Sequence, residues 1–394
     1  MAMKRLEDLD VAGKRVLVRV DFNVPLDEHQ NVTSDARIVA AIPTLTALRD
    51  RGARLILMSH LGRPKGAVND KLRMLPVAER LHELTGWPVR SAPEIIGPLV
   101  KDLALSLEDG EVLMLENLRF DPREEAGDAE FGAELAALGE VFVQDAFGTC
   151  HRAHASVARI PEHLPSAPGL LLAKEIDAFA KVLDHPERPF VAILGGAKVS
   201  DKLPVLENLL PRVDRLIIGG AMAYTFLKAQ GKPTGKSLVE DDLIDEARRV
   251  LRDAEAAGKV LALPVDHVVS AEFRADSPHE VVTEIPDGML ALDIGPRTSE
   301  LYAEHLKDAK TVLWNGPMGV FEMEAFRKGT EAVARAVANC KGFRCVGGGD
   351  SVAALELLGL DDAVDHVSTG GGASLELLEG KVLPGVAALQ DAAS

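Results

Sequence analysis

Short runs of apolar residues alternate with amphipathic helical segments along the whole chain. Each run is apolar at almost every position, which is typical of parallel strands buried on both faces of a sheet. The predicted strands are Arg15–Val20, Arg54–Met58, Glu111–Leu115, Glu140–Val143, Phe190–Leu194, Arg215–Ile218, Lys259–Leu263, Thr311–Leu313 and Arg344–Val346. The predicted helices between them are Asp35–Arg49, Leu75–Leu84, Ala129–Leu138, Asp241–Ala256 and Ala325–Ala338. This alternation predicts an α/β fold built from doubly wound parallel sheets.

The length of 394 residues favours two domains over one. Prolines and a glycine cluster at Pro161–Gly169, and Leu170–Leu183 then reads as a connecting helix. We expect two Rossmann-like domains separated by a cleft and joined by this hinge helix. The expected ranges are 1–170 for the N-terminal domain, 171–185 for the interdomain helix and 186–380 for the C-terminal domain. The segment 381–394 is expected to be either a tail or a latch that returns to the N-terminal domain.

The net charge of −17 excludes a general affinity for nucleic acid or for an anionic membrane. The chain has 3 cysteines and no C-x-x-C pair, which favours a reducing compartment. Its first residues lack the apolar core of a secretion signal, and no apolar stretch reaches the length of a membrane span. These features predict a soluble, cytoplasmic protein.

In the N-terminal half, a polar loop follows each of the four predicted strands directly. These loops are Arg19–Pro25, Ser59–Pro64, Glu116–Phe120 and Asp145–His154. Loops at the carboxyl ends of the strands of an open α/β sheet line its ligand crevice, so Arg63, Arg119 and Arg152 should converge. A single loop arginine is more often a solvated charge, but guanidinium groups gathered at equivalent strand ends suit phosphate and carboxylate oxygens. The sequence therefore predicts an anion-binding site here.

In the C-terminal half, three glycine-rich turns precede helices. They are Gly195–Lys202, Gly347–Ser351 and Thr369–Ser374. Glycine lets backbone N–H groups approach an anion closely, and a helix N-terminus adds partial positive charge. Lys198 and Lys202 would place positive charge near phosphates. Asp350 is either a helix N-cap or a ligand of Mg²⁺ carried by a nucleotide.

Two other nucleotide sites fit the sequence less well. The segment Gly231–Ser237 resembles a phosphate-binding loop, but three residues separate its glycines instead of four, and it follows a helical stretch. The dinucleotide fingerprint G-x-G-x-x-G is absent from the first strand–turn–helix unit, which disfavours an NAD-dependent dehydrogenase.

Taken in order, the motifs resemble the phosphoglycerate kinase family over essentially the whole chain. The four N-terminal loops, the last of them extended to Asp145–Ser156, resemble the family's triose-phosphate loops. The segments that resemble its nucleotide side are Gly195–Lys202, Trp314–Glu322, Gly347–Ser351 and Ser368–Lys381. Two departures are Cys150 where alanine is expected and Ser351 where threonine is common. Neither departure alters a charge, so the resemblance still implies activity.

The resemblance implies reversible phosphoryl transfer from 1,3-bisphosphoglycerate to ADP, which gives 3-phosphoglycerate and ATP in glycolysis and gluconeogenesis. The implied triose-binding residues are Asp21, Asn23, Arg37, His60, Arg63, Arg119, His151 and Arg152. The implied nucleotide-binding residues are Lys198, Lys202, Gly219, Gly220, Gly295, Asn315, Glu322, Gly348, Gly349, Asp350 and Ser351, with Asp350 at the Mg²⁺ ion. The alternative is a catalytically inactive scaffold that binds phosphorylated ligands on the same fold.

Direct in-line transfer requires no general base, because the carboxylate of 3-phosphoglycerate is already ionised. Catalysis should then depend on positioning and on stabilisation of the moving charge. The residues expected to provide it are Arg37, Lys202, Gly349 and Gly372. Domain closure, with hinges at Leu170–His185 and Ser368–Val386, would bring the substrates into line. We expect the chain to act as a monomer.

Overall fold

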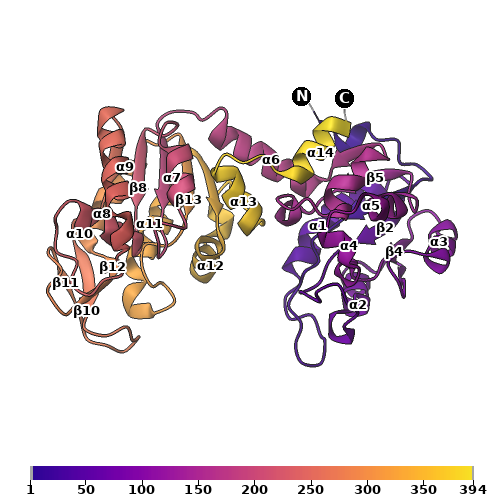
Figure 1. Cartoon of the computed structure of the whole chain (residues 1–394), viewed down its shortest axis with the longest axis horizontal. Helices are drawn as coiled ribbons and strands as arrows, with labels where there is room; N and C mark the ends of the chain where they lie inside the picture. Colours follow the sequence, from indigo (N-terminus) through magenta and orange to yellow (C-terminus); the bar gives the residue numbers. More distant parts are fainter. Residues whose placement is uncertain (1–2, 393–394) are drawn as a thin grey trace. The chain divides into compact units, whose positions relative to one another are not determined.

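The computed structural model describes residues 3–392. These residues form two compact units (Figure 1). The first unit extends to Ile176 and also takes in the residues from Val382 onward, and the second unit is Asp177–Lys381. Within residues 3–392, no helix is both long enough and apolar enough to cross a membrane.

The first unit contains a parallel sheet of six strands in the order β3-β4-β2-β1-β5-β6. The strands are β1 (Arg15–Arg19), β2 (Arg54–Met58), β3 (Val89–Ser91), β4 (Val112–Met114), β5 (Val141–Gln144) and β6 (Ser166–Pro168). Val16 on β1 lies opposite Leu55 on β2 and Val141 on β5, and all three side chains are buried. The chain leaves β1 towards β2 on one side and returns to β5 on the other, so the strand order reverses at β1. An open α/β sheet binds its ligand at such a reversal.

Helices surround this sheet and form the rest of the first unit. They are α1 (Ala36–Arg49), α2 (Leu75–Thr85), α3 (Pro98–Leu105), α4 (Pro122–Glu125), α5 (Ala129–Ala136), the first part of α6 (Leu170–Leu183), and α14 (Pro384–Ala392). Local sequence sets several of their ends. The α2 helix ends at Gly86, whose φ of 69° suits glycine, and Asp128 caps α5 by accepting a hydrogen bond from the Phe131 amide.

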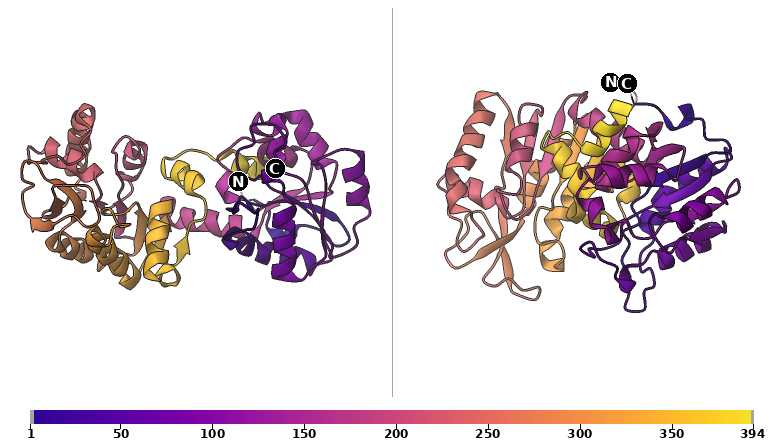
Figure 2. Two further views of the ribbon diagram at one scale, coloured as in Figure 1. Left: turned by 90° about the horizontal axis from the view of Figure 1, so that it is seen from below. Right: turned by 45° about the vertical axis from the view of Figure 1, so that its right-hand side comes forward.

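The C-terminal helix α14 belongs to the first unit. It contacts β6 and the single turns η5 (Ala155–Arg159) and η6 (Ile160–Glu162). Figure 2 shows this yellow helix beside magenta segments of the first unit in both views. The Gly385 amide donates to the Cys150 carbonyl at 2.9 Å, which ties the C-terminal segment to the loop that follows β5.

The second unit contains another parallel six-stranded sheet, in the order β15-β14-β13-β7-β8-β9. Its strands are β7 (Phe190–Leu194), β8 (Arg215–Ile218), β9 (Val260–Ala262), β13 (Thr311–Asn315), β14 (Phe343–Gly347) and β15 (His366–Val367). The strand order reverses between β7 and β13, which are paired neighbours. A small antiparallel sheet accompanies it, with β10 (His267–Ser270) between β11 (His279–Val282) and β12 (Leu290–Ile294).

The helices of the second unit are α7 (Leu203–Leu209), α8 (Met222–Ala229), α9 (Ile244–Ala256), α10 (Pro296–Leu306), α11 (Lys328–Asn339), α12 (Gly349–Leu358) and α13 (Gly371–Leu378), together with the last part of α6. The core between the large sheet and its helices includes Trp314, Val312 and Ile193, all fully buried. Trp314 donates its indole N–H to the Gly316 carbonyl at 2.7 Å, so its one polar atom is satisfied.

The doubly wound fold class predicted from the sequence is confirmed. The small antiparallel sheet was not predicted, because β11 is largely exposed and no continuous apolar run marks it. The segment Pro161–Gly169, taken as a boundary, contains β6, the edge strand of the first sheet. An edge strand tolerates proline because it forms a ladder on one side alone. The structure divides the units inside α6, between Ile176 and Asp177.

Candidate active site

The loops after β1 and β2 are tied together at the carboxyl edge of the first sheet. The Phe22 amide donates to Ser59 Oγ at 2.9 Å, and the Gly62 amide donates to Asn23 Oδ1 at 2.9 Å. Asn23 thus uses its side chain to hold the neighbouring loop. The sequence predicted that these loops would meet, and the two hydrogen bonds fix how they do so.

The loop after β4 joins them through Asn117, which is fully buried. Its Oδ1 accepts from the Leu61 amide at 3.1 Å, and its Nδ2 donates to the carbonyls of Leu61 at 2.7 Å and Leu72 at 2.9 Å. The side chain therefore bridges the loop after β4 and the segment that follows β2. Asn117 lies in a predicted loop, but the sequence alone did not single it out.

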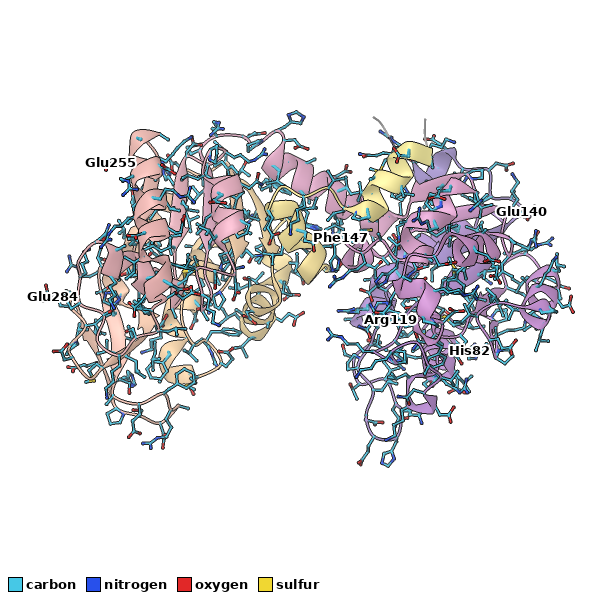
Figure 3. The ribbon with its side chains drawn as sticks, viewed as in Figure 1. His82, Arg119, Glu140, Phe147, Glu255 and Glu284 are labelled. Atoms are coloured by element: carbon cyan, nitrogen blue, oxygen red, sulfur yellow. The ribbon has the colours of Figure 1, made fainter. Side chains whose placement is uncertain are left out.

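Arginine side chains gather over these loops. Arg37 on α1 places its Nη1 at 2.9 and 3.0 Å from the two carboxylate oxygens of Asp21. Arg119, labelled in Figure 3, donates to the Gly62 carbonyl at 3.0 Å, and its Nε is buried without a hydrogen-bond acceptor. Arg63 and Arg152 are exposed on the same set of loops. Burial lowers the pKa of Arg119, and the charge of Arg63 acts in the same direction.

Two buried histidines accompany the arginines. The pKa of His154 is lowered to about 4, chiefly by burial and further by Arg119 and Arg19. The pKa of His60 is held well below its usual value by burial first, and then by Arg19 and Arg119. Both imidazoles are therefore neutral at physiological pH. His151, the third predicted histidine, lies half-buried in the loop after β5. The positive charge of the site thus resides on arginine, which suits an anionic ligand.

The lowered pKa of His154 predicts a pH dependence of stability. The unfolded chain takes up a proton on this histidine below about pH 6.5, whereas the folded chain resists protonation down to about 4. The free energy of unfolding should therefore fall as pH drops through this window, by about 2 kcal/mol at pH 5. The free energy of unfolding is measured by urea denaturation at several pH values, and its slope against pH should lose this contribution in a His154→Gln variant. Replacing exposed His29 by glutamine is the matched control and should keep the wild-type slope. Equal slopes for wild type and His154→Gln would contradict the prediction.

Arg19, the last residue of β1, lies in a predicted site loop but was not predicted as a site residue. Its side chain is fully buried, and its Nη2 lies 3.2 Å from His60 Nδ1. The available signal was a charged residue that ends an otherwise apolar strand next to a predicted site loop. Arg15 begins the same strand and is a partly exposed partner of Glu140, so an arginine in this strand did not by itself indicate a buried side chain.

The second unit gathers its predicted residues where β7 and β13 end. Lys202 hydrogen-bonds through Nζ to Asn315 Oδ1, and the Gly316 amide donates to Ser351 Oγ at 2.5 Å. Burial lowers the pKa of Lys202, and the nearby carboxylate of Asp350 opposes that shift. Three of the predicted nucleotide-side segments are therefore in contact through Lys202, Asn315 and Ser351.

Glycines bring these loops close together. A Cβ on Gly195 would lie 2.1 Å from the Pro317 carbonyl oxygen, and one on Gly220 would lie 2.5 Å from the Gly196 carbonyl oxygen. Gly219 packs equally closely against Met318, whose sulfur would be 2.3 Å from an added Cβ. The predicted residues Gly219 and Gly220 thus belong to the same set of loops as Gly195.

The remaining predicted nucleotide-side residues lie around this set. Lys198 is exposed in the loop after β7. Gly295 follows β12, and Glu322 is exposed at the end of the loop after β13. The Val320 amide donates to the Leu292 carbonyl at 2.9 Å, so that loop lies beside β12.

Two helix N-termini carry the other glycine-rich turns. Helix α12 begins at Gly349 after Gly348, whose φ is 90°, and helix α13 begins at Gly371. An added Cβ on Gly349 would have no heavy atom within 4 Å, and Gly372 is exposed in the first turn of α13. The first amides of a helix lack intrahelical partners and favour phosphate.

Asp350 lies exposed in the first turn of α12, and the N-cap position of this helix is Gly348 instead. Among residues 3–392, no group of three or more His, Cys, Asp or Glu side chains could hold a metal ion. A single carboxylate fits Mg²⁺ that arrives with nucleotide phosphates and keeps part of its water shell. The residues present therefore fit a nucleotide-borne Mg²⁺ ion.

Comparisons with known proteins agree on one family. The family model described as Phosphoglycerate kinase matches residues 6–381. A phosphoglycerate kinase of Moorella thermoacetica is 58% identical over 393 residues, which cover 99% of this chain and 100% of the relative. One of Chloroflexus aggregans is 54% identical and covers 100% of both chains.

Solved structures give the same result. The structure of phosphoglycerate kinase from Coxiella burnetii has a TM-score of 0.93, with 40% identity and 100% coverage of both chains. The crystal structure of the enzyme from Pyrococcus horikoshii OT3 has a TM-score of 0.83, with 32% identity and 99% coverage of both. The family predicted from the motifs is confirmed. The chain belongs to the phosphoglycerate kinase family.

Proposed function

We propose that each of the two units binds one substrate of the reaction that this chain catalyses. This reaction is the transfer of a phosphoryl group between 1,3-bisphosphoglycerate and ADP. The first unit binds the triose substrate and the second binds the nucleotide. The observation that carries this proposal is the contrast between the two sets of loops. One presents arginines and neutral histidines, whereas the other presents glycine-rich helix N-termini beside Lys202.

The triose substrate is bound by the loops that Asn23 and Asn117 join. Arg37 and Arg119 interact with its carboxylate and phosphate oxygens, and the neutral imidazole of His60 forms a hydrogen bond with it. Arg63, His151 and Arg152 complete the basic site, and Asp21 interacts with the substrate hydroxyl. The interaction of Asp21 with Arg37 supports this arrangement, because it orients the arginine before substrate binds.

The nucleotide phosphates are bound by the N-termini of α12 and α13 and by Lys202. Asp350 holds the Mg²⁺ ion, which neutralises phosphate charge when it is bound. The base and ribose are bound by the predicted residues of the surrounding loops: Gly219, Gly220, Gly295, Asn315 and Glu322. Lys198 lies at the phosphate end.

Transfer proceeds in line, without a protein general base. Arg37 and Lys202 stabilise the moving charge, together with the amides near Gly349 and Gly372. Since the two substrates bind to different units, we propose that the units close around them, with α6 and Ser368–Val386 as hinges. Small-angle scattering should then show compaction when both ligands are present. We also propose that the chain acts as a cytoplasmic monomer.

A coupled assay tests the proposal. The chain is mixed with 3-phosphoglycerate and MgATP, and the 1,3-bisphosphoglycerate formed is reduced by a glyceraldehyde-phosphate dehydrogenase with NADH. Turnover that depends on both substrates supports the reaction. A folded chain that binds both ligands but shows no turnover would favour the inactive scaffold instead. Binding of NAD(H) to the chain in a titration would instead indicate a dehydrogenase.

Removal of Mg²⁺ is expected to abolish turnover in this assay. EDTA should stop the reaction, and excess Mg²⁺ should restore it. An Asp350→Asn variant should need more Mg²⁺ for half-maximal rate, on the order of ten- to a hundredfold, as when groups around a bound metal are removed. Glu356→Gln, farther along α12, is the matched control and should keep the wild-type Mg²⁺ dependence. An unchanged requirement in Asp350→Asn would remove Asp350 from the metal site.

A further inference from the structure

The guanidinium of Arg19 is held by contacts in three directions. Nε donates to Ser156 Oγ at 2.8 Å, Nη1 donates to the Val20 carbonyl at 2.6 Å, and Nη2 lies 3.2 Å from His60 Nδ1. The side chain is fully buried, so water does not replace any of these partners. Rotation away from His60 would break the other two hydrogen bonds. The position of Arg19 relative to His60 is therefore fixed by the fold.

Glu124 anchors the other end of this network. Ser156 accepts from Arg19 through Oγ and donates onward to Glu124 Oε1 at 2.5 Å, while the Ser156 amide donates to Oε2 at 2.9 Å. Glu124 is fully buried, and its carboxylate balances the buried charge of Arg19 through Ser156. Burial raises the pKa of Glu124, and Arg19 opposes this shift. Every hydrogen bond in the network thus has a defined direction.

This direction determines the tautomer of His60. A guanidinium has donors and no acceptor, so the Nδ1 atom of His60 must accept from Arg19. A neutral imidazole that accepts at Nδ1 carries its proton on Nε2. A second proton on Nδ1 would point an N–H group at another N–H group. Arg119, Arg37 and His154 are charged or titratable groups near His60, and each of them also disfavours a positive charge on it.

We propose that Arg19 is a positioning residue that holds His60 neutral with its proton on Nε2, so that His60 donates a hydrogen bond to the anionic triose substrate. The identity of that ligand rests on the proposed function, whereas the tautomer is a property of the chain without ligand. A neutral donor adds a hydrogen bond without adding charge to a site that already contains several arginines. The resulting interaction with substrate should not change with pH near neutrality.

Nuclear magnetic resonance of the ligand-free chain, labelled with ¹⁵N histidine, tests the tautomer directly. Long-range couplings between ring protons and nitrogens distinguish the two neutral forms, and a His60→Gln variant assigns the signals. We expect His60 to carry its proton on Nε2, with no titration near neutral pH. A proton on Nδ1, or a mixture of the two forms, would overturn the proposal whether or not the chain is active.

The role of Arg19 is tested in an Arg19→Met, Glu124→Gln double variant, which removes both buried charges together. His60 should then sample both tautomers and titrate closer to the value of a free histidine. Glu124→Gln alone keeps Arg19 and should keep the wild-type tautomer. The signals of His267, which is in the second unit, serve as an internal control for folding. If the double variant does not fold, an Arg19→Gln, Glu124→Gln variant replaces it, because a glutamine amide can either donate to or accept from His60 Nδ1 and should likewise allow both tautomers.

Kinetics separate positioning from a merely structural role. The KM for 3-phosphoglycerate should rise about tenfold or more in the double variant, the effect of one hydrogen bond to a charged ligand, with a smaller change in kcat. Adding His60→Gln to that variant should cause no further rise, because both changes remove the same interaction. Full additivity would show that Arg19 does not act through His60. A wild type with the expected tautomer but no turnover would contradict the proposed function and leave the tautomer assignment standing.

Discussion

Replacing Arg37 by alanine is expected to lower kcat by a factor of about 10² to 10³, the usual cost of losing one group that stabilises transition-state charge. Arg37 is half exposed on α1 and is oriented by Asp21, so its guanidinium is available to a ligand and already held in place. An arginine held in this way loses little entropy when it meets the transferring phosphoryl group. The KM for 3-phosphoglycerate should rise less than kcat falls. The measurement is a steady-state assay in both directions of the reaction.

Arg80→Ala is the matched control for Arg37→Ala. Arg80 also pairs with an aspartate in the first unit, Asp35 at the start of α1, and is similarly exposed. A surface ion pair of this kind contributes little, so kcat should stay within about twofold of wild type. Arg37→Lys keeps the charge but loses the planar fork and should recover part of the rate. An Arg37→Ala enzyme with wild-type kcat would remove Arg37 from catalysis and leave it as a surface charge.

The sequence predicted a candidate site at the carboxyl edge of each sheet, because charged or glycine-rich residues directly follow apolar strands. Topology then brings such residues together, whatever their separation along the chain. Arg119 and Lys202 were predicted in this way, and both lie in the networks described above. The hydrogen bonds of Asn23 and Asn117 to neighbouring loops could not be predicted, because they depend on the register of β1, β2 and β4.

The burial of Arg19 could not be predicted from the sequence. A buried arginine needs partners, and here Ser156, which is 137 residues farther along the chain, accepts from Arg19 and is itself bound to Glu124. Glu124 lies in a stretch rich in charged residues, Asp121–Glu125, that reads as solvent-exposed. Its burial depends on how α4 packs against η5, which is a tertiary property. Strand β6 is a similar case, since Pro168 within it and Pro165 before it read as a boundary until the pairing with β5 is known.

A Gly316→Ala variant is expected to lose the proposed nucleotide site of the second unit. Gly316 has a φ of 107°, which strains any L side chain, and an added Cβ would lie 2.1 Å from the Gly195 carbonyl oxygen. Both obstacles are backbone, so neither can rotate away. The loops after β7 and β13 would have to separate, and Ser351 would lose the Gly316 amide. We expect a loss of about 3 kcal/mol or more in the stability of this unit.

Trp314 reports on this change directly, because its indole donates to the Gly316 carbonyl. The chain has 2 tryptophans, so a Trp87→Phe background leaves Trp314 as the single probe, and it lies in the second unit. Its fluorescence should shift in Gly316→Ala before denaturant is added, and MgADP should no longer protect the unit from unfolding. Gly371→Ala is the steric control, because an added Cβ there meets no heavy atom within 4 Å, and its stability should change by less than about 1 kcal/mol. If both variants unfold at the wild-type midpoint, the close approach of the two loops is not what holds the nucleotide site together. If Gly316→Ala alone is destabilised and loses protection by MgADP, the meeting point of β7 and β13 is both the structural support and the binding surface of the second unit.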